Sequence, residues 1–191
     1  MLRPRACFLL CLVVLAAASR VLPHPPNFAP IAAVALFGSA TFAGRRSAVL
    51  VPFGSLLLGD VLLHAGFLAG WQPMPGFYGG QWVVYACLLP AIALGFAIRG
   101  RRTVATVAAA TLANAVVFFL TTNFACFYGA GSPYPRTIPG LILCYELALP
   151  FFRNSLAGDA FFATALFGGL ALAEAKFPAI RGRSTAAEIA A

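Results

Sequence analysis

The sequence predicts an all-α, polytopic membrane protein in which six transmembrane helices form one bundle. Hydrophobic residues make up 61% of the 191-residue chain and charged residues only 9%, whereas a soluble domain carries about 25% charged residues. The mean hydropathy is +0.90. The arginines stand between apolar runs and not in one patch, so the formal charge of +8 indicates topology and not a nucleic-acid surface. The length favours a single integral membrane domain, residues 1–191.

Apolar runs separated by short basic or proline-rich segments define the six expected spans. Arg3 and Arg5 precede the first run and small residues follow it, a pattern that also fits a cleaved signal peptide. We favour a span, because the rest of the chain is itself membrane-embedded. The second span carries Ala35, Ser39 and Ala43 at a spacing of four, which is typical of a close helix–helix contact. The spans are expected at about residues 6–19, 31–44, 47–67, 82–98, 103–120 and 155–175, with a frayed tail at 176–191.

The apolar run at residues 138–152 is expected to form an extra short helix on the outer side. As a helix, residues 138–149 reach only about 18 Å at 1.5 Å per residue, against roughly 30 Å of hydrocarbon. With six spans and the N-terminus inside, ten cationic residues fall on the inner side and three on the outer side, whereas a seventh span would give eight and five. The positive-inside rule therefore favours both termini in the cytoplasm.

Polar residues gather toward the outer side of this topology. Asp60, Asn114 and Asp159 fall at similar depth on three spans, and ionisable groups within a membrane are functional by default. Hydrogen bonding between helices is the alternative role for these three. The outer loops add polar and aromatic side chains that could close over a pocket. The candidate substrate-binding residues are Asn27, Asp60, His64, Trp71, Tyr78, Asn114, Asn123, Tyr145, Glu146, Asn154 and Asp159.

Two short patterns concern the aspartates. Asp60 and His64 are four residues apart and share a helix face, so they are expected to pair and to orient a ligand group. Because only one other histidine is present and no Cys-x-x-Cys occurs, we expect no metal site and no bound cofactor. Gly59–Asp60 and Gly158–Asp159 form a weak internal echo, which suggests similar places for the two aspartates. No P-loop occurs, so the chain is not expected to hydrolyse ATP by that route.

Four stretches carry a family resemblance: PHPPNFAPIAAVALFG (23–38), TNF (122–124), GLILCY (140–145) and PFFRNSLAGD (150–159). They resemble a bacterial membrane family of unknown function that is described as a putative transport protein. That family is similar to the substrate-binding S components of energy-coupling-factor vitamin transporters. The resemblance implies six helices, capture of substrate from outside under three outer loops, and a location in the bacterial inner membrane. It also implies a separate energy-coupling transmembrane subunit and ATPases as partners.

The expected function is therefore substrate capture by a membrane subunit and not catalysis. The solute is expected to be small and partly aromatic or cationic, and membrane lipid surrounds the bundle. One alternative is an integral-membrane enzyme that uses Asp60 and His64 as acid and base. The other is a non-catalytic structural subunit, for which the polar loop residues would tolerate replacement by alanine.

Overall fold

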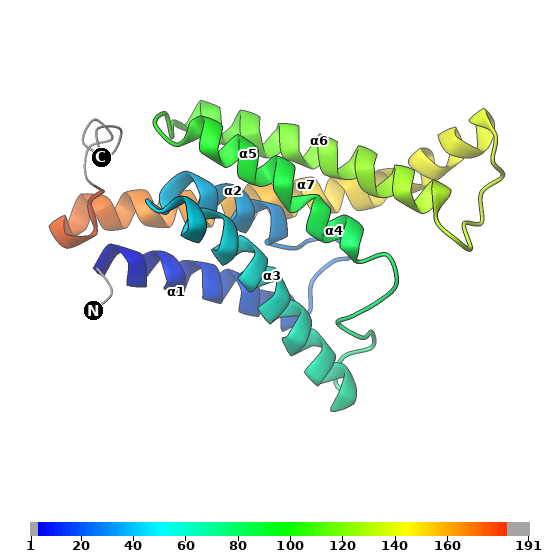
Figure 1. Cartoon of the computed structure of the whole chain (residues 1–191), viewed down its shortest axis with the longest axis horizontal. Helices are drawn as coiled ribbons and strands as arrows, with labels where there is room; N and C mark the ends of the chain where they lie inside the picture. The colour runs from blue at the N-terminus through cyan, green and yellow to red at the C-terminus, as the bar shows by residue number, and fades with distance from the viewer. Residues whose placement is uncertain (1–3, 183–191) are drawn as a thin grey trace.

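The computed structural model describes residues 4–182, and every regular element within that range is helical (Figure 1). This confirms the all-α prediction for the described part of the chain. In chain order the elements are α1 (Pro4–Ala18), η1 (Ser19–Val21), α2 (Ile31–Thr41), α3 (Arg45–Leu68), α4 (Trp82–Ala86), α5 (Leu88–Ile98), α6 (Val104–Tyr128), α7 (Ile138–Lys176) and η2 (Pro178–Ile180).

Helix α2 lies at the centre of the fold. Nine of its eleven residues are buried, because other helices cover it on every side. Three apolar clusters meet on it. Phe37 belongs to the cluster shared with α1, α3 and α7, Ala35 to the cluster shared with α3 and α5, and Leu36 to the cluster shared with α5 and α6. A helix that is apolar all round and buried in this way is held by packing and not by its own propensity.

The small-residue contact predicted for α2 is present over part of its length. Ala35 and Ser39 are fully buried, and α5 approaches so closely that a Cβ on Gly95 would overlap the Ser39 side chain. The Ser39 hydroxyl donates to the carbonyl of Ala35 at 2.7 Å, so this close contact leaves no unsatisfied donor. Ala43 takes no part, because α2 ends before it and Ala43 is exposed. Small side chains therefore set the separation of α2 and α5.

The connections between helices are sorted between the two ends of the bundle (Figure 1). Both ends of the described chain, the α2–α3 turn and the α5–α6 turn lie toward one end. The three longer connections, residues 22–30, 69–81 and 129–137, lie toward the other end, which we call the link end. This alternation matches the order of spans and loops that the charge distribution predicts.

Four helices are long and apolar enough to cross a membrane within residues 4–182, instead of the six predicted from the sequence. They are α1 with η1, α3, α6 and α7. Helix α2 is apolar but its eleven residues extend only about 16 Å, because Pro30 stands at its start and the chain turns after Thr41. Helices α4 and α5 together cover Trp82–Ile98, and this pair is also too short for a full-length span. Helix α2 therefore completes the bundle from within, and the α4–α5 pair completes it along one side.

The sequence prediction is wrong for residues 138–152, which form no separate helix at the outer surface. They are the first part of α7, a continuous helix of 39 residues that includes Pro150. The expected break is absent because α6 also continues past residue 120, to Tyr128, and gives this part of α7 a partner. The Tyr145 hydroxyl donates to the Leu120 carbonyl at 2.8 Å, and the rings of Phe119 and Phe152 lie 4.7 Å apart. A 39-residue helix is about 58 Å long, so the α6–α7 hairpin projects beyond the rest of the bundle (Figure 1).

The expected frayed tail is structured in its first part. Helix α7 ends at Lys176, and η2 turns the chain back toward α1, where Arg5 donates to the carbonyl of Ile180 at 2.7 Å. Residues 183–191 of the predicted tail lie outside the described residues. The first helix packs against the rest of the bundle, with Leu9 and Val13 in the main apolar cluster.

Candidate functional site

A cavity of about 770 Å³ lies at the link end, between the connections and the helices below them. We call it the link cavity. Its walls come from η1, the proline-rich connection 22–30, the connection 69–81 and residues of α2, α6 and α7. The volume is in the range of pockets that bind small molecules. Four of the predicted site residues line it, namely Asn27, Trp71, Tyr78 and Asp159.

Asp159 is the carboxylate of the link cavity. It is only 6% exposed, and no residue of the described chain donates a hydrogen bond to it or pairs with it. Gly158 places it there, because a Cβ at that position would press on the backbone of Phe28 and Ala29 in the proline-rich connection. The absence of a side chain lets this connection lie against α7 directly beside the carboxylate. A buried charge without a partner is costly, so this group is ready to bind a cation or a proton.

A small polar cluster continues behind Asp159. Asn114 and Thr111 of α6 line the same narrow space as Asp159 and Ala32. Asn114 is 2% exposed, and within the described residues its amide nitrogen, its carbonyl oxygen and the Thr111 hydroxyl have no hydrogen-bond partner. Most buried polar groups are satisfied, so three neighbouring unpaired atoms are unusual and could bond to a bound polar group.

Asp60, by contrast, is fully satisfied within the protein. It is 1% exposed, and its Oδ1 forms an ion pair with Arg20 at 2.7 Å. Its Oδ2 accepts hydrogen bonds from the Gln81 amide at 2.6 Å and from the Tyr85 hydroxyl at 2.7 Å. The Arg20 guanidinium also donates to the carbonyl of Leu56 at 3.1 Å. Asp60 thus joins η1, α3 and the start of α4, and its carboxylate does not line the link cavity.

Two glycines make this ion-pair network possible. A Cβ on Gly59 would overlap the Arg20 guanidinium, and a Cβ on Gly76 would overlap the backbone of Asp60 and His64. Gly76 therefore lets the connection 69–81 lie directly on α3. Gln81 then reaches back from the end of that connection and also donates to the Gly76 carbonyl at 3.1 Å. The weak sequence echo of the two Gly-Asp pairs corresponds to two close approaches, but the two aspartates occupy different environments.

The predicted pairing of Asp60 and His64 is not formed. The His64 ring packs edge-on against Phe77 at 5.4 Å and lies 6.3 Å from Phe67. Its Nδ1 is buried and has no hydrogen-bond partner among residues 4–182. The pairing fails because Asp60 already has three stronger partners and because the connection 69–81 covers the face between the two residues. Within the described residues no group of three metal-ligating side chains is assembled.

Three of the predicted asparagines, Asn27, Asn123 and Asn154, lie in or near the proline-rich connection. Asn27 has a left-handed backbone, with φ of 63°, which asparagine tolerates better than most residues. The Asn154 amide donates to the Pro26 carbonyl at 3.0 Å and ties the connection to α7. Asn123 donates to the Phe119 carbonyl of its own helix and lines a side pocket of about 220 Å³ that it shares with Asn27.

Two predicted site residues lie away from the link cavity. Glu146 is exposed on the projecting part of α7, and Tyr145 uses its hydroxyl to bind α6. Both were placed near a pocket on the assumption that residues 138–152 fold over it. Because that segment continues into α7 and points outward, neither side chain reaches the cavity.

Sequence reasoning missed Arg20, Gln81 and Tyr85, which complete the Asp60 network. Arg20 stands at the end of an apolar run, where an arginine is usually interpreted as a marker of membrane topology and not as an ion-pair partner. The available clue was its depth: Arg20 ends the first span on the side where Asp60 lies late in α3, and a buried carboxylate needs a cation. The connection 69–81 also binds η1 directly, since the Gln72 amide donates to the Val21 carbonyl at 3.0 Å.

Two loop aromatics stand at the mouth of the link cavity. Trp71 and Tyr78 are more than half exposed, so they border the cavity without filling it. Partial burial and then the negative charge of Asp60 raise the pKa of the Tyr78 phenol, while Arg20 acts in the opposite sense. The phenol therefore stays a neutral hydroxyl at physiological pH, and both rings can offer a face to a cation.

The fold and the cavity define a class: an all-helical protein with long apolar helices and a cavity under two connections, 22–30 and 69–81. The chain belongs to a family of unknown function, DUF6580, whose model matches residues 1–180. This agrees with the resemblance to a family of unknown function noted above. No curated protein and no solved structure matches the chain.

Proposed function

We propose that the protein is a membrane-embedded substrate-capture subunit that binds a small solute in the link cavity. The observation that carries this proposal is the Asp159 carboxylate, which is nine-tenths buried, faces a cavity of about 770 Å³ and has no partner among the described residues. A solute that supplies the missing partner would offset the cost of burying this charge. The unpaired Asn114 and Thr111 beneath it add hydrogen-bonding capacity at the same place.

The lining points to an organic cation with an apolar part as the solute. Among the described lining residues, Arg20 is the only one with a fixed positive charge, and the buried Asp60 neutralises it. Asp159 therefore supplies the uncompensated charge of the lining. Trp71, Met74 and Tyr78 at the mouth provide faces that attract a cation or pack on an apolar body. An anionic solute would meet an unpaired carboxylate of the same sign.

Membrane insertion and transport complete the proposal. The four long apolar helices favour insertion, with the link end on the outer side of a bacterial inner membrane and both termini in the cytoplasm. The cavity lies under the connections 22–30 and 69–81, and the S components that the sequence resembles likewise capture substrate under outer loops. We therefore propose an energy-coupling transmembrane subunit with ATPases as the partner that drives release of the solute to the inside.

The enzyme alternative draws no support from the geometry. An acid–base pair would need Asp60 and His64 within reach of each other and of a substrate. Asp60 is held by Arg20, Gln81 and Tyr85, and neither Asp60 nor His64 lines the link cavity. A purely structural role would not explain why the buried polar groups around Asp159 have no partners among the described residues.

The test is to identify what the purified protein retains. We expect mass spectrometry of small molecules released from the detergent-solubilised wild-type protein to find a cation that Ala32→Phe no longer retains. Ala32 lines both the link cavity and the space around Asn114, so the larger side chain fills the site. Ala160→Phe is the matched control, since Ala160 is exposed on α7 beside Asp159 and lines neither space. Equal retention by wild type and both variants would exclude the link cavity as the capture site.

A second test concerns the topology. In a chain whose five native cysteines are replaced, we expect an impermeant thiol reagent added from outside to label Gly79→Cys and Ser132→Cys but not Gly100→Cys or Gly182→Cys. Gly79 is a suitable position in the connection 69–81, because a side chain there meets nothing within 4 Å, whereas Gly76 is packed on α3. Labelling of Gly182→Cys from outside in intact cells would contradict the proposed orientation.

A further inference from the structure

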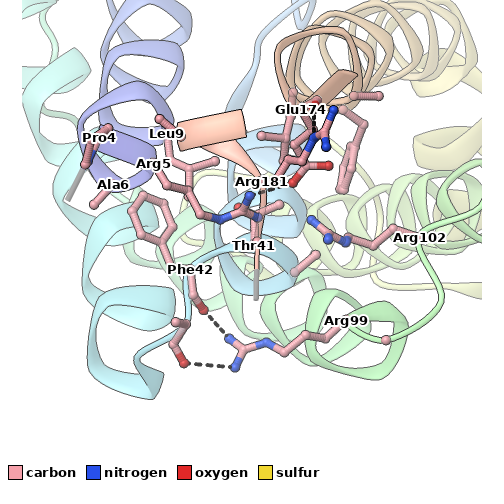
Figure 2. A pocket seen from close by; sticks show the side chains of 18 residues that line it. Pro4, Arg5, Ala6, Leu9, Thr41, Phe42, Arg99, Arg102, Glu174 and Arg181 are labelled. Atoms are coloured by element: carbon pink, nitrogen blue, oxygen red, sulfur yellow. Dashed lines mark hydrogen bonds and ion pairs between the residues drawn. The ribbon is translucent and has the colours of Figure 1, made fainter. Parts of the chain in front are cut away.

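A second cavity, of about 680 Å³, lies at the end of the bundle opposite the link end (Figure 2). We call it the basic cavity. It lies where the two ends of the described chain and the turns after α2 and α5 come together. None of its lining residues is shared with the link cavity, so its role is separate from that of Asp159.

The lining of the basic cavity is strongly cationic. Four arginines reach it from three segments, as Figure 2 shows, and Glu174 is the single carboxylate among the lining residues that the structure describes. These four positive charges and one negative charge give the described lining a formal net charge of +3. The arginines are Arg5 in α1, Arg99 and Arg102 in the α5–α6 turn and Arg181 after η2.

Backbone carbonyls orient three of these guanidinium groups. Arg99 donates to the carbonyls of Ser39 at 2.9 Å and Phe42 at 2.7 Å, at the end of α2. Arg181 donates to the Glu174 carbonyl at 2.8 Å, near the end of α7. Arg5 forms the ion pair with the Glu174 side chain and also donates to η2. Fixed guanidinium groups are suited to bind a phosphate, because little conformational entropy is lost on binding.

The inner wall of the basic cavity is apolar. Leu9 of α1, Ala40 of α2 and Phe167 with Leu170 of α7 form this wall, and Leu9 and Leu170 belong to the main apolar cluster. The cavity therefore joins a cationic rim to an apolar surface that leads between helices. A soluble phosphate would use only the rim, whereas a phospholipid would use both parts. Basic pockets between helices at a membrane surface are typical sites for anionic lipid headgroups.

We propose that the basic cavity binds the phosphate headgroup of an anionic phospholipid, with an acyl chain along the apolar wall. This proposal rests on the membrane insertion proposed above but not on solute capture. The headgroup links three segments at this end of the bundle, namely α1, the α5–α6 turn and the segment after α7. The lipid thus fixes the end of the bundle that lies away from the solute site.

The test uses native mass spectrometry of the full chain in detergent, titrated with phosphatidylglycerol and, separately, with phosphatidylcholine. We expect the wild-type protein to bind phosphatidylglycerol at least fivefold more tightly. Arg102→Gln should weaken that binding about fivefold, and Arg102→Gln with Arg181→Gln about 25-fold, since each surface cation contributes roughly that factor. Arg101→Gln is the matched control, because Arg101 adjoins Arg102 in the same turn but does not line the cavity.

Three outcomes would overturn the proposal. One is an unchanged phosphatidylglycerol affinity in the double variant, and another is an equal loss in Arg101→Gln. The third is displacement of the lipid by millimolar inorganic phosphate, which would assign the cavity to a soluble phosphate compound. Loss of lipid binding with normal solute retention, or the reverse, separates this proposal from that of the link cavity.

Discussion

Replacing Arg20 with alanine is expected to destabilise the protein by about 3–5 kcal/mol, as is typical when one partner of a buried ion pair is removed. Asp60 is 1% exposed, so the variant would leave its carboxylate buried with only Gln81 and Tyr85 as donors. The Leu56 carbonyl would lose its contact with the guanidinium as well. For a chain of this size, the loss corresponds to a fall in melting temperature of roughly 6–20 °C.

The measurement is thermal unfolding of detergent-solubilised protein. Arg153→Ala is the control, because Arg153 is exposed on α7 and removes the same charge without breaking the network. The double variant Arg20→Met with Asp60→Leu should recover most of the loss, since an apolar pair of similar volume replaces both charges. Equal melting temperatures for Arg20→Ala and Arg153→Ala would show that the ion pair is not a stabilising contact.

This expectation revises the role that the sequence suggests for Asp60. An intramembrane carboxylate is a functional candidate by default, and on that basis its removal should weaken ligand binding and leave the fold intact. The structure instead surrounds it with Arg20, Gln81 and Tyr85, so its removal should act first on stability. Depth along the first span was the one clue to this partner, because Arg20 is 40 residues away and belongs to a segment whose direction depends on the proline-rich connection.

Composition and periodicity were sufficient to predict an all-helical fold but not the number of full-length spans or the ends of the helices. Apolar runs locate each helical segment, because backbone groups in an apolar setting must be satisfied locally. The end of α6 was misplaced, since Thr121, Thr122 and Asn123 look like a loop. In the structure Thr122 and Asn123 donate to carbonyls of their own helix four residues back, so they extend α6.

The candidate site was predicted in part for a related reason. Depth along a span can be estimated by counting residues, so Asn114 and Asp159 were correctly expected to lie at one level, and they share one buried space. The contacts across connections could not be counted in this way. Gly76 looks like an ordinary loop glycine, yet it determines how closely the connection 69–81 approaches α3. Such an approach depends on three-dimensional register, which the spacing of residues does not encode.

The second large effect is expected at Asp159, on binding and not on stability. Asp159→Asn should lower the affinity for the cation recovered from the wild-type protein by about 10- to 150-fold, the factor that corresponds to one hydrogen bond to a charged group. The size of the side chain is kept, so the cavity keeps its shape. The melting temperature of the ligand-free protein should stay the same or rise, because the substitution removes a buried charge that has no partner.

Glu146→Gln is the matched control for this prediction, since it removes the same charge from the same helix at an exposed position away from the link cavity. Equilibrium binding and thermal unfolding of these two variants check the prediction, and together with the Arg20 variants they separate the roles of the two aspartates in the Gly-Asp echo. Asp60 is neutralised by Arg20 within the protein, so its loss appears as unfolding. Asp159 lacks such a partner, so its loss appears as weaker capture of the solute. An unchanged dissociation constant in Asp159→Asn, with a loss in Glu146→Gln, would move the site out of the link cavity and onto the projecting hairpin.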